Sequence, residues 1–195
     1  FLDLKFHDIP NTVAGAAEAC VRLRVEMLNV HISGGREMLE RTMRQVCATA
    51  QELGQARPLV LGVTVLTSLD AQTWAETLGI TERPVSEQVV HLARLAQASG
   101  LDGVVASPHE IQAVKAACGP EFLVLTPGIR LPDAPVLGDD QARTLTPAQA
   151  AVLGADFIVV GRPITRSRDP ARTCAQIRRD IAIATTGEQL FQGQK

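Results

Sequence analysis

Three charged residues near the start of the chain, Asp3, Lys5 and Asp8, have types and a spacing suited to electrostatic and proton-transfer chemistry. They occur in the stretch FLDLKFHDIPNT, which otherwise has the apolar character of a buried strand. Side chains two apart on a strand share a face, so Asp3 and Lys5 are expected to point the same way. Asp8 follows where Pro10 turns the chain. A structural salt bridge would account for one Asp–Lys pair but not for the second aspartate, so the pattern favours a catalytic site.

A second candidate site follows the last two expected strands. Gly161 and Arg162 come directly after a strand in IVVGRPIT, and Arg130 follows the preceding strand in LTPGIR. Glycine allows backbone N–H groups to approach phosphate oxygens, and a guanidinium group binds them through two parallel hydrogen bonds. Gln141 lies in the long loop between these motifs, which could fold over a bound ligand. The pattern predicts a phosphate-binding site, although arginines that only rim the sheet would be the alternative.

The elements that must position these residues alternate regularly between strand and helix. Short aliphatic segments predict strands at 1–6, 26–32, 58–66, 102–107, 122–129 and 156–161, and amphipathic segments between and after them predict helices. The sequence TPAQ carries a helix cap at Thr146 with Pro147 at the first helical position, and SPHE predicts a similar capping box that begins with Ser107. Strands that alternate with helices predict a parallel sheet with right-handed crossovers.

Two parallel architectures compete, an open doubly wound sheet and a closed (β/α)8 barrel. No glycine-rich dinucleotide loop follows the first strand, which disfavours the open sheet. Polar residues follow almost every strand, and in a barrel these ends converge on one mouth. We therefore predict a (β/α)8 TIM barrel of which strands 3–8 and their helices are present. A barrel takes about 250 residues, so the first two units, about 60 residues, would be lacking. Residues 1–195 are expected to form this single domain, with 185–195 as a flexible tail.

Composition excludes several classes of partner. The 195 residues carry a net charge of −2 and show no basic patch, so a nucleic acid partner is not expected. No apolar run approaches the roughly 20 residues of a membrane span, so no membrane partner is expected. The four cysteines occur singly, without a CxxC pair, as is typical of free thiols in a reducing cytoplasm.

The motifs together resemble, in the same order, those of the bacterial orotidine 5′-phosphate decarboxylase family. The segments that carry the resemblance are DLKFHDIPNT, NVHISGG, VTVLTS, LDGVVAS, LTPGIR, GDDQAR and IVVGRPIT. The resemblance covers residues 1–184. It implies a TIM barrel, a homodimer, and the conversion of orotidine 5′-monophosphate to UMP, the last step of de novo pyrimidine synthesis, without cofactor or metal.

The resemblance also implies roles for individual residues. Lys5 would donate a proton to C6 of the pyrimidine, and Asp3 would lie beside the substrate carboxylate. Asp8 and Thr12 would reach the neighbouring subunit's site. The remaining contacts to the nucleotide and its phosphate would come from Thr67, Arg130, Gln141, Gly161 and Arg162. His31, which ends a strand in NVHISGG, is expected to be a packed, hydrogen-bonded residue and not a catalytic one.

The chain departs from the family pattern in one respect. The family's first two strands supply an aspartate that binds the ribose and a second lysine, and neither lies in this sequence. We therefore expect these 195 residues to be inactive alone. Two alternatives remain: a Mg2+-dependent sugar-phosphate decarboxylase or aldolase of the same superfamily, and a non-catalytic nucleotide-binding fragment.

Overall fold

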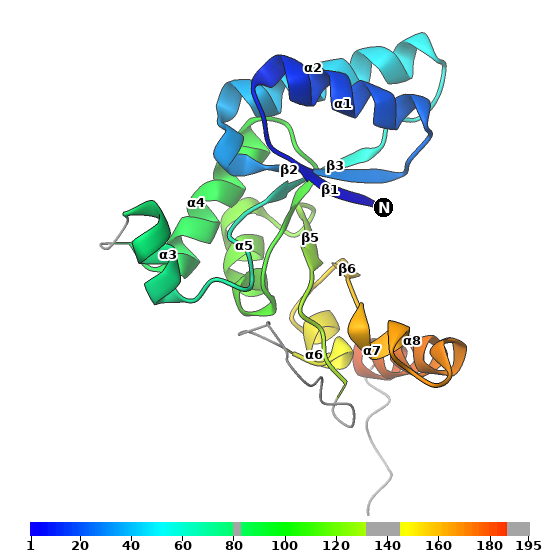
Figure 1. Ribbon diagram of the computed structural model, residues 1–195. Coiled ribbons are helices and arrows are strands. Elements are labelled where there is room, and N and C mark those ends of the chain that lie inside the picture. Colours follow the sequence, from blue (N-terminus) through cyan, green and yellow to red (C-terminus); the bar gives the residue numbers. More distant parts are fainter. Residues whose placement is uncertain (80–82, 132–144, 187–195) are drawn as a thin grey trace, which may run out of the picture.

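A computed structural model describes residues 1–79, 83–131 and 145–186 (Figure 1). Within these residues, six parallel strands form one sheet in chain order. The strands are β1 (Leu2–Phe6), β2 (Met27–His31), β3 (Leu59–Val63), β4 (Gly103–Val105), β5 (Leu123–Thr126) and β6 (Phe157–Ile158). The helices are α1 (Pro10–Arg22), α2 (Arg36–Glu52), α3 (Ala71–Leu78), α4 (Val85–Ala98), α5 (Ile111–Cys118), α6 (Pro147–Val152), α7 (Arg162–Thr165) and α8 (Pro170–Thr186), with 3-10 turns η1 (Ile32–Gly34) and η2 (Pro108–Glu110). The alternation expected from the sequence is confirmed.

The two faces of the sheet bury different sets of apolar side chains. Alternate strand residues form a small inner cluster, which consists of Met27, Leu61, Val63, Val105 and Leu125 with Leu59, Leu123 and Val159 packed against it. The residues between them belong to the larger cluster shared with the helices, and include Leu28, Val30, Val60, Val104 and Val124. The helices cover the outer face as the sheet curves round (Figure 1). The described strands thus form a parallel half-barrel, with β1 and β6 at its two edges.

Helix starts follow the capping chemistry of the sequence in one case and depart from it in another. Before α6, the hydroxyl of Thr146 accepts the Gln149 N–H and the Gln149 side chain accepts the Thr146 N–H, so the expected capping box is confirmed. In SPHE, the hydroxyl of Ser107 accepts the N–H of His109 instead. The segment therefore begins as the 3-10 turn η2, and α5 starts only at Ile111.

Two aspartates hold the amino ends of the strands. Asp102, just before β4, accepts two hydrogen bonds of 2.7 Å from Arg57 and one of 2.8 Å from the N–H of Val60 in β3. Asp156, just before β6, pairs with Lys115 at 2.7 Å and accepts the N–H of Val124 in β5. Each carboxylate thereby joins the start of one strand to its neighbour. These contacts stabilise the sheet at the end opposite to the candidate site.

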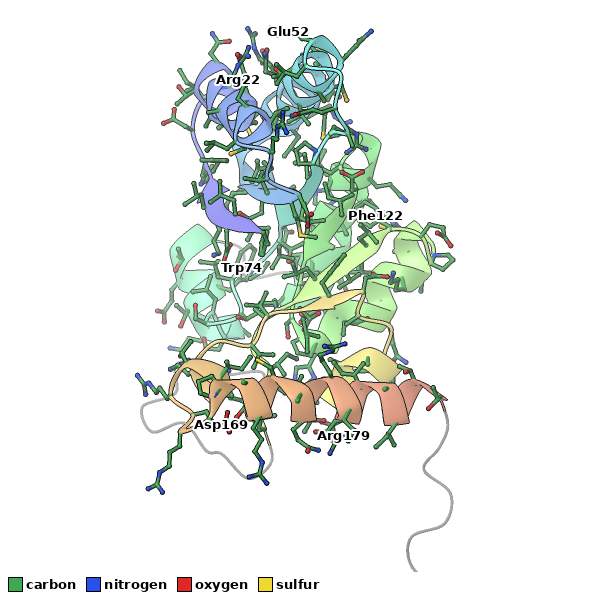
Figure 2. All side chains as sticks on the ribbon, turned by 90° about the vertical axis from the view of Figure 1, so that its right-hand side faces the viewer. Arg22, Glu52, Trp74, Phe122, Asp169 and Arg179 are labelled. Atoms are coloured by element: carbon green, nitrogen blue, oxygen red, sulfur yellow. The ribbon has the colours of Figure 1, made fainter. Side chains whose placement is uncertain are left out.

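The outer helices carry the charged surface. Figure 2 shows Arg22 and Glu52 on the paired helices α1 and α2. At the other end of the molecule it shows Asp169 just before α8 and Arg179 within α8. Arg22 bonds Glu18 within α1 and reaches Glu52 at 3.4 Å. None of the helices in the described ranges is long and apolar enough to cross a membrane. The single-domain assignment stays a prediction, and most of the expected 185–195 tail lies outside the described residues.

Candidate active site

A bulge interrupts β1, the edge strand of the described sheet, where the charged pair lies. Leu2 pairs with Leu28 and Phe6 with Val30, so four residue steps of β1 oppose two of β2. Within the bulge, Lys5 has a φ of +51°, a left-handed conformation that costs a non-glycine residue about 1–2 kcal/mol. The regular alternation assumed from the sequence is therefore interrupted. Asp3 and Lys5 meet as expected, but the bulge shapes the backbone that brings them together.

Asp3 accepts hydrogen bonds from two directions. The Lys5 Nζ lies 2.7 Å from Asp3 Oδ1, and the Asn29 Nδ2 donates to the same oxygen at 2.6 Å. Burial by itself raises the pKa of Asp3, but the hydrogen bonds from Lys5 and Asn29 and the charge of Lys5 together hold that pKa below its usual value. The side chains of Lys5 and Asp3 remain 38% and 43% exposed. The site thus presents an ionised carboxylate and an ammonium group that a ligand can reach.

Asp8 lies apart from this pair. It is exposed, and its Oδ1 accepts the N–H of Ile9 at 2.6 Å. Among the described ion pairs, Lys5 contacts Asp3 and not Asp8, so only one of the two aspartates pairs with the lysine. Thr12, on the first turn of α1, is also exposed. Asp8 and Thr12 are therefore both accessible at the start of α1.

Two histidines lie next to the pair. The rings of His7 and His31 are 5.1 Å apart between centroids and tilted by 36°. Burial, followed by the charges of His7 and Lys5, lowers the pKa of His31. His31 is thus half-buried against His7, which meets the packing part of the prediction, whereas the described residues give its side chain no hydrogen bond. It stays neutral under conditions where an exposed imidazole would take up a proton.

The predicted phosphate-binding residues lie at the same end of the parallel sheet as the charged pair. Thr67 is buried beyond the end of β3, and Arg130 follows β5. Gly161 follows β6, and Arg162 is the first residue of α7. Arg130 also donates to the carbonyl of Ile129 at 2.9 Å. A Cβ placed on Gly161 would meet no atom within 4 Å, so packing does not require a glycine there. Gln141 lies outside the described residues.

One site residue was not recognised from the sequence. Asn29 in β2 is fully buried, and it bonds both the Asp3 carboxylate and the Lys5 backbone N–H, the latter at 2.8 Å. The available signal was a lone amide in the middle of the apolar strand EMLNVHI. Within the described residues, no group of three or more His, Cys, Asp or Glu side chains could hold a metal ion.

The fold and this site define a class. A parallel half-barrel that carries an ion pair and polar residues at the carboxyl ends of its strands is the arrangement of a (β/α)-barrel enzyme. Comparisons with known proteins then identify the family. Residues 1–177 match the model of the orotidine 5′-phosphate decarboxylase / HUMPS family, and the chain belongs to that family.

Individual relatives agree with this assignment. The chain is 53% identical over 185 residues to an orotidine 5′-phosphate decarboxylase of Moorella thermoacetica, covering 94% of the chain and 71% of that relative. It is 52% identical to the corresponding protein of Trichlorobacter lovleyi, covering 91% of the chain and 71% of the relative. The crystal structure of orotidine 5′-phosphate decarboxylase from Lactobacillus acidophilus matches with a TM-score of 0.79 at 38% identity, over 93% of this chain and 74% of that one. The six strands therefore form part of a TIM barrel.

Proposed function

We propose that the protein decarboxylates orotidine 5′-monophosphate to UMP, in de novo pyrimidine synthesis. The proposal is supported by relatives of that name that are about half identical to this chain. The observation that carries it is the ion pair of Lys5 and Asp3 at the carboxyl end of β1, since this reaction needs one positive and one negative group at a single carbon.

The proposed chemistry follows from the charge that develops. Cleavage of the bond between C6 and the carboxylate releases CO2 and leaves the bonding electron pair on C6. No adjacent group delocalises that pair, and enzymes of the most demanding kind lower such barriers by about 20 kcal/mol or more. Asp3 would lie beside the departing carboxylate and disfavour its charge. Lys5 would stabilise the carbanion and transfer a proton from Nζ to C6, then regain a proton from water.

Contacts away from C6 would supply binding energy. We assign the nucleotide and phosphate contacts to Thr67, Arg130, Gln141, Gly161 and Arg162. The support is their position after successive strands of a parallel sheet, whose carboxyl ends meet at one mouth. Phosphate binding by these groups would position the pyrimidine against the charged pair.

We further propose that the enzyme is a homodimer in which Asp8 and Thr12 serve the neighbouring subunit's site. Both residues are exposed, and Asp8 accepts a hydrogen bond from the Ile9 N–H and makes no ion pair with Lys5 in the described residues, which supports this role. A cytoplasmic location is proposed as well, in keeping with four cysteines that form no disulfide. No described feature favours the Mg2+-dependent alternative.

The test uses the protein expressed from its complete natural gene, incubated with orotidine 5′-monophosphate with and without EDTA. We expect UMP and CO2 to form equally in both. Lys5→Ala should abolish turnover while the circular dichroism spectrum is unchanged, because an exposed ion pair contributes at most about 1 kcal/mol to folding. Substantial decarboxylation by Lys5→Ala would contradict the assignment. Tight UMP binding without any turnover by the wild-type protein would select the non-catalytic alternative.

A further inference from the structure

We propose that Asn29 is a positioning residue, which holds the β1 bulge and thereby sets the Asp3 carboxylate and the Lys5 ammonium group against each other. The inference rests on the proposed function for its catalytic consequence. Its geometric part concerns the three side chains alone and can be tested without turnover.

The first step concerns the place of Asn29 in the sheet. Its Cα pairs with that of Leu61 on β3, and alternation along β2 gives it the same face as Met27. Met27 and Leu61 both belong to the inner aliphatic cluster. Asn29 itself is fully buried. An amide in such surroundings costs several kcal/mol unless both its donor and its acceptor find partners.

The second step concerns those partners, which both come from the bulge. The Asn29 Nδ2 donates to Asp3 Oδ1 at 2.6 Å, and the Asn29 Oδ1 accepts the Lys5 N–H at 2.8 Å. Between Leu2 and Phe6, β1 leaves the regular register with β2. The side chain of Asn29 thus bonds β1 in the region where the backbone ladder is interrupted.

The third step links this contact to the reacting groups. Lys5 holds its left-handed φ while its N–H is bonded to Asn29, so the amide helps to stabilise a conformation that a lysine would otherwise avoid. That conformation determines where the Lys5 side chain leaves the backbone. The Lys5 Nζ and the Asn29 Nδ2 both bond Asp3 Oδ1, so neither of them engages Oδ2. Asn29 therefore orients the carboxylate and supports the backbone of the lysine through two hydrogen bonds of one side chain.

The fourth step is electrostatic. The amide is a neutral donor, so it favours the ionised form of Asp3 and contributes to the lowered pKa of that carboxyl group. Removal of the donor should move the pKa of Asp3 upward.

The experiment compares Asn29→Ala with the wild-type protein, in the form expressed from the complete natural gene. Three quantities are measured: kcat and KM for orotidine 5′-monophosphate, the Kd for UMP by calorimetry, and the pKa of Asp3 from its carboxyl 13C shift. We expect kcat to fall about 100-fold, as for other small misplacements of reacting groups. The Kd for UMP should be unchanged, and the pKa of Asp3 should rise.

A matched control is Thr42→Val in α2. Thr42 is also fully buried, and its hydroxyl donates to the carbonyl of Met38 at 2.8 Å, within the same helix. This variant removes one buried side-chain hydrogen bond that lies within a helix and does not involve the sheet. It should leave all three quantities unchanged. A drop in kcat common to Asn29→Ala and Thr42→Val would mean that only general packing is at stake, and would overturn the proposal.

Asn29→Asp provides a second variant of nearly the same size. It keeps an acceptor for the Lys5 N–H but places a carboxylate oxygen where the donor to Asp3 stood, and two adjacent carboxylates share a proton. The acid limb of the kcat profile should therefore move to higher pH. Unchanged kcat in Asn29→Ala together with an unchanged Asp3 pKa would refute the positioning role. If the wild-type protein does not turn over the nucleotide, the proposed function fails, and the Asp3 pKa alone decides the positioning role.

Discussion

Two aspartates at opposite ends of the sheet offer a direct separation of catalysis from stability. Asp3 lies in the β1 bulge and Asp102 lies just before β4. Each accepts a 2.7 Å hydrogen bond from a cationic side chain, so the two direct contacts are alike. We expect Asp3→Asn to abolish most activity at little cost in stability, and Asp102→Asn to do the opposite.

The magnitudes follow from burial and from the number of bonds. The Asp3–Lys5 pair is 43% and 38% exposed, and ion pairs of that exposure contribute about 0.2–1 kcal/mol. The Asp102 side chain is only 15% exposed and accepts three hydrogen bonds, from Arg57 twice and from Val60. An amide oxygen in the place of Oδ2 can keep the bonds from Val60 and from one Arg57 nitrogen, but the amide nitrogen then turns a donor toward the other Arg57 nitrogen. Because Arg57 is partly exposed, water compensates some of the lost interaction with it. We therefore expect the free energy of unfolding to fall by about 2 kcal/mol, which corresponds to about 4–8 °C in Tm.

The assay pairs urea unfolding, followed by circular dichroism, with the rate of UMP formation. Asp3→Asn should lower kcat by at least about 100-fold, since it removes a charge placed at the reacting carboxylate. Its unfolding midpoint should stay close to that of the wild-type protein. Asp102→Asn should unfold at lower urea with kcat preserved. If Asp3→Asn instead loses as much stability as Asp102→Asn and keeps its activity, the division between a catalytic and a structural end of the sheet is wrong.

Three further predictions concern binding, pH and packing. Arg162→Ala should weaken UMP binding about 10- to 100-fold by calorimetry, the loss of a charged hydrogen bond, and an unchanged Kd would remove it from the phosphate site. Because folding lowers the pKa of His31, the unfolded chain binds a proton at this residue before the folded chain does as the pH falls below 6.5, so the free energy of unfolding declines there. In urea titrations from about pH 7 to about pH 5, the free energy of unfolding of His31→Gln should decline less than that of the wild-type protein. An identical decline in the two proteins would refute this. Gly103→Ala should cost about 1–3 kcal/mol because its Cβ would collide with the Leu123 carbonyl, whereas Gly15→Ala, in open space on α1, should stabilise by about 0.5–1 kcal/mol; equal effects in thermal melts would contradict both.

Much of the fold follows from local patterns. Short continuous aliphatic runs and the helix cap at Thr146 depend on residues a few positions apart, so the strand and helix order and the α6 capping box were predictable. The meeting of Asp3 and Lys5 was predictable for the same reason, since they are two residues apart. The 3-10 start after Ser107 was not, because several local hydrogen-bond patterns suit the same SPHE sequence.

The long-range contacts were beyond the reach of such patterns. Asn29 is 26 residues from Asp3 in the chain, and Asp102 is 45 residues from Arg57. A single amide in an apolar strand indicates that hydrogen-bond partners are needed, but the sequence does not say which residues supply them. The hydrogen bond from the Ile9 N–H to Asp8 depends likewise on how Ile9 and Pro10 enter α1.

By itself, the sequence determined the class of fold, the family through its ordered motifs, and the residue types available for chemistry, because these depend on local patterns and on short spacings between residues. Tertiary structure alone decided the bulge in β1, the left-handed backbone of Lys5, and the use of Asn29 to bind both Asp3 and Lys5. The physical reason is that a buried polar group is satisfied only by the atoms that folding brings to it, and those atoms come from another strand.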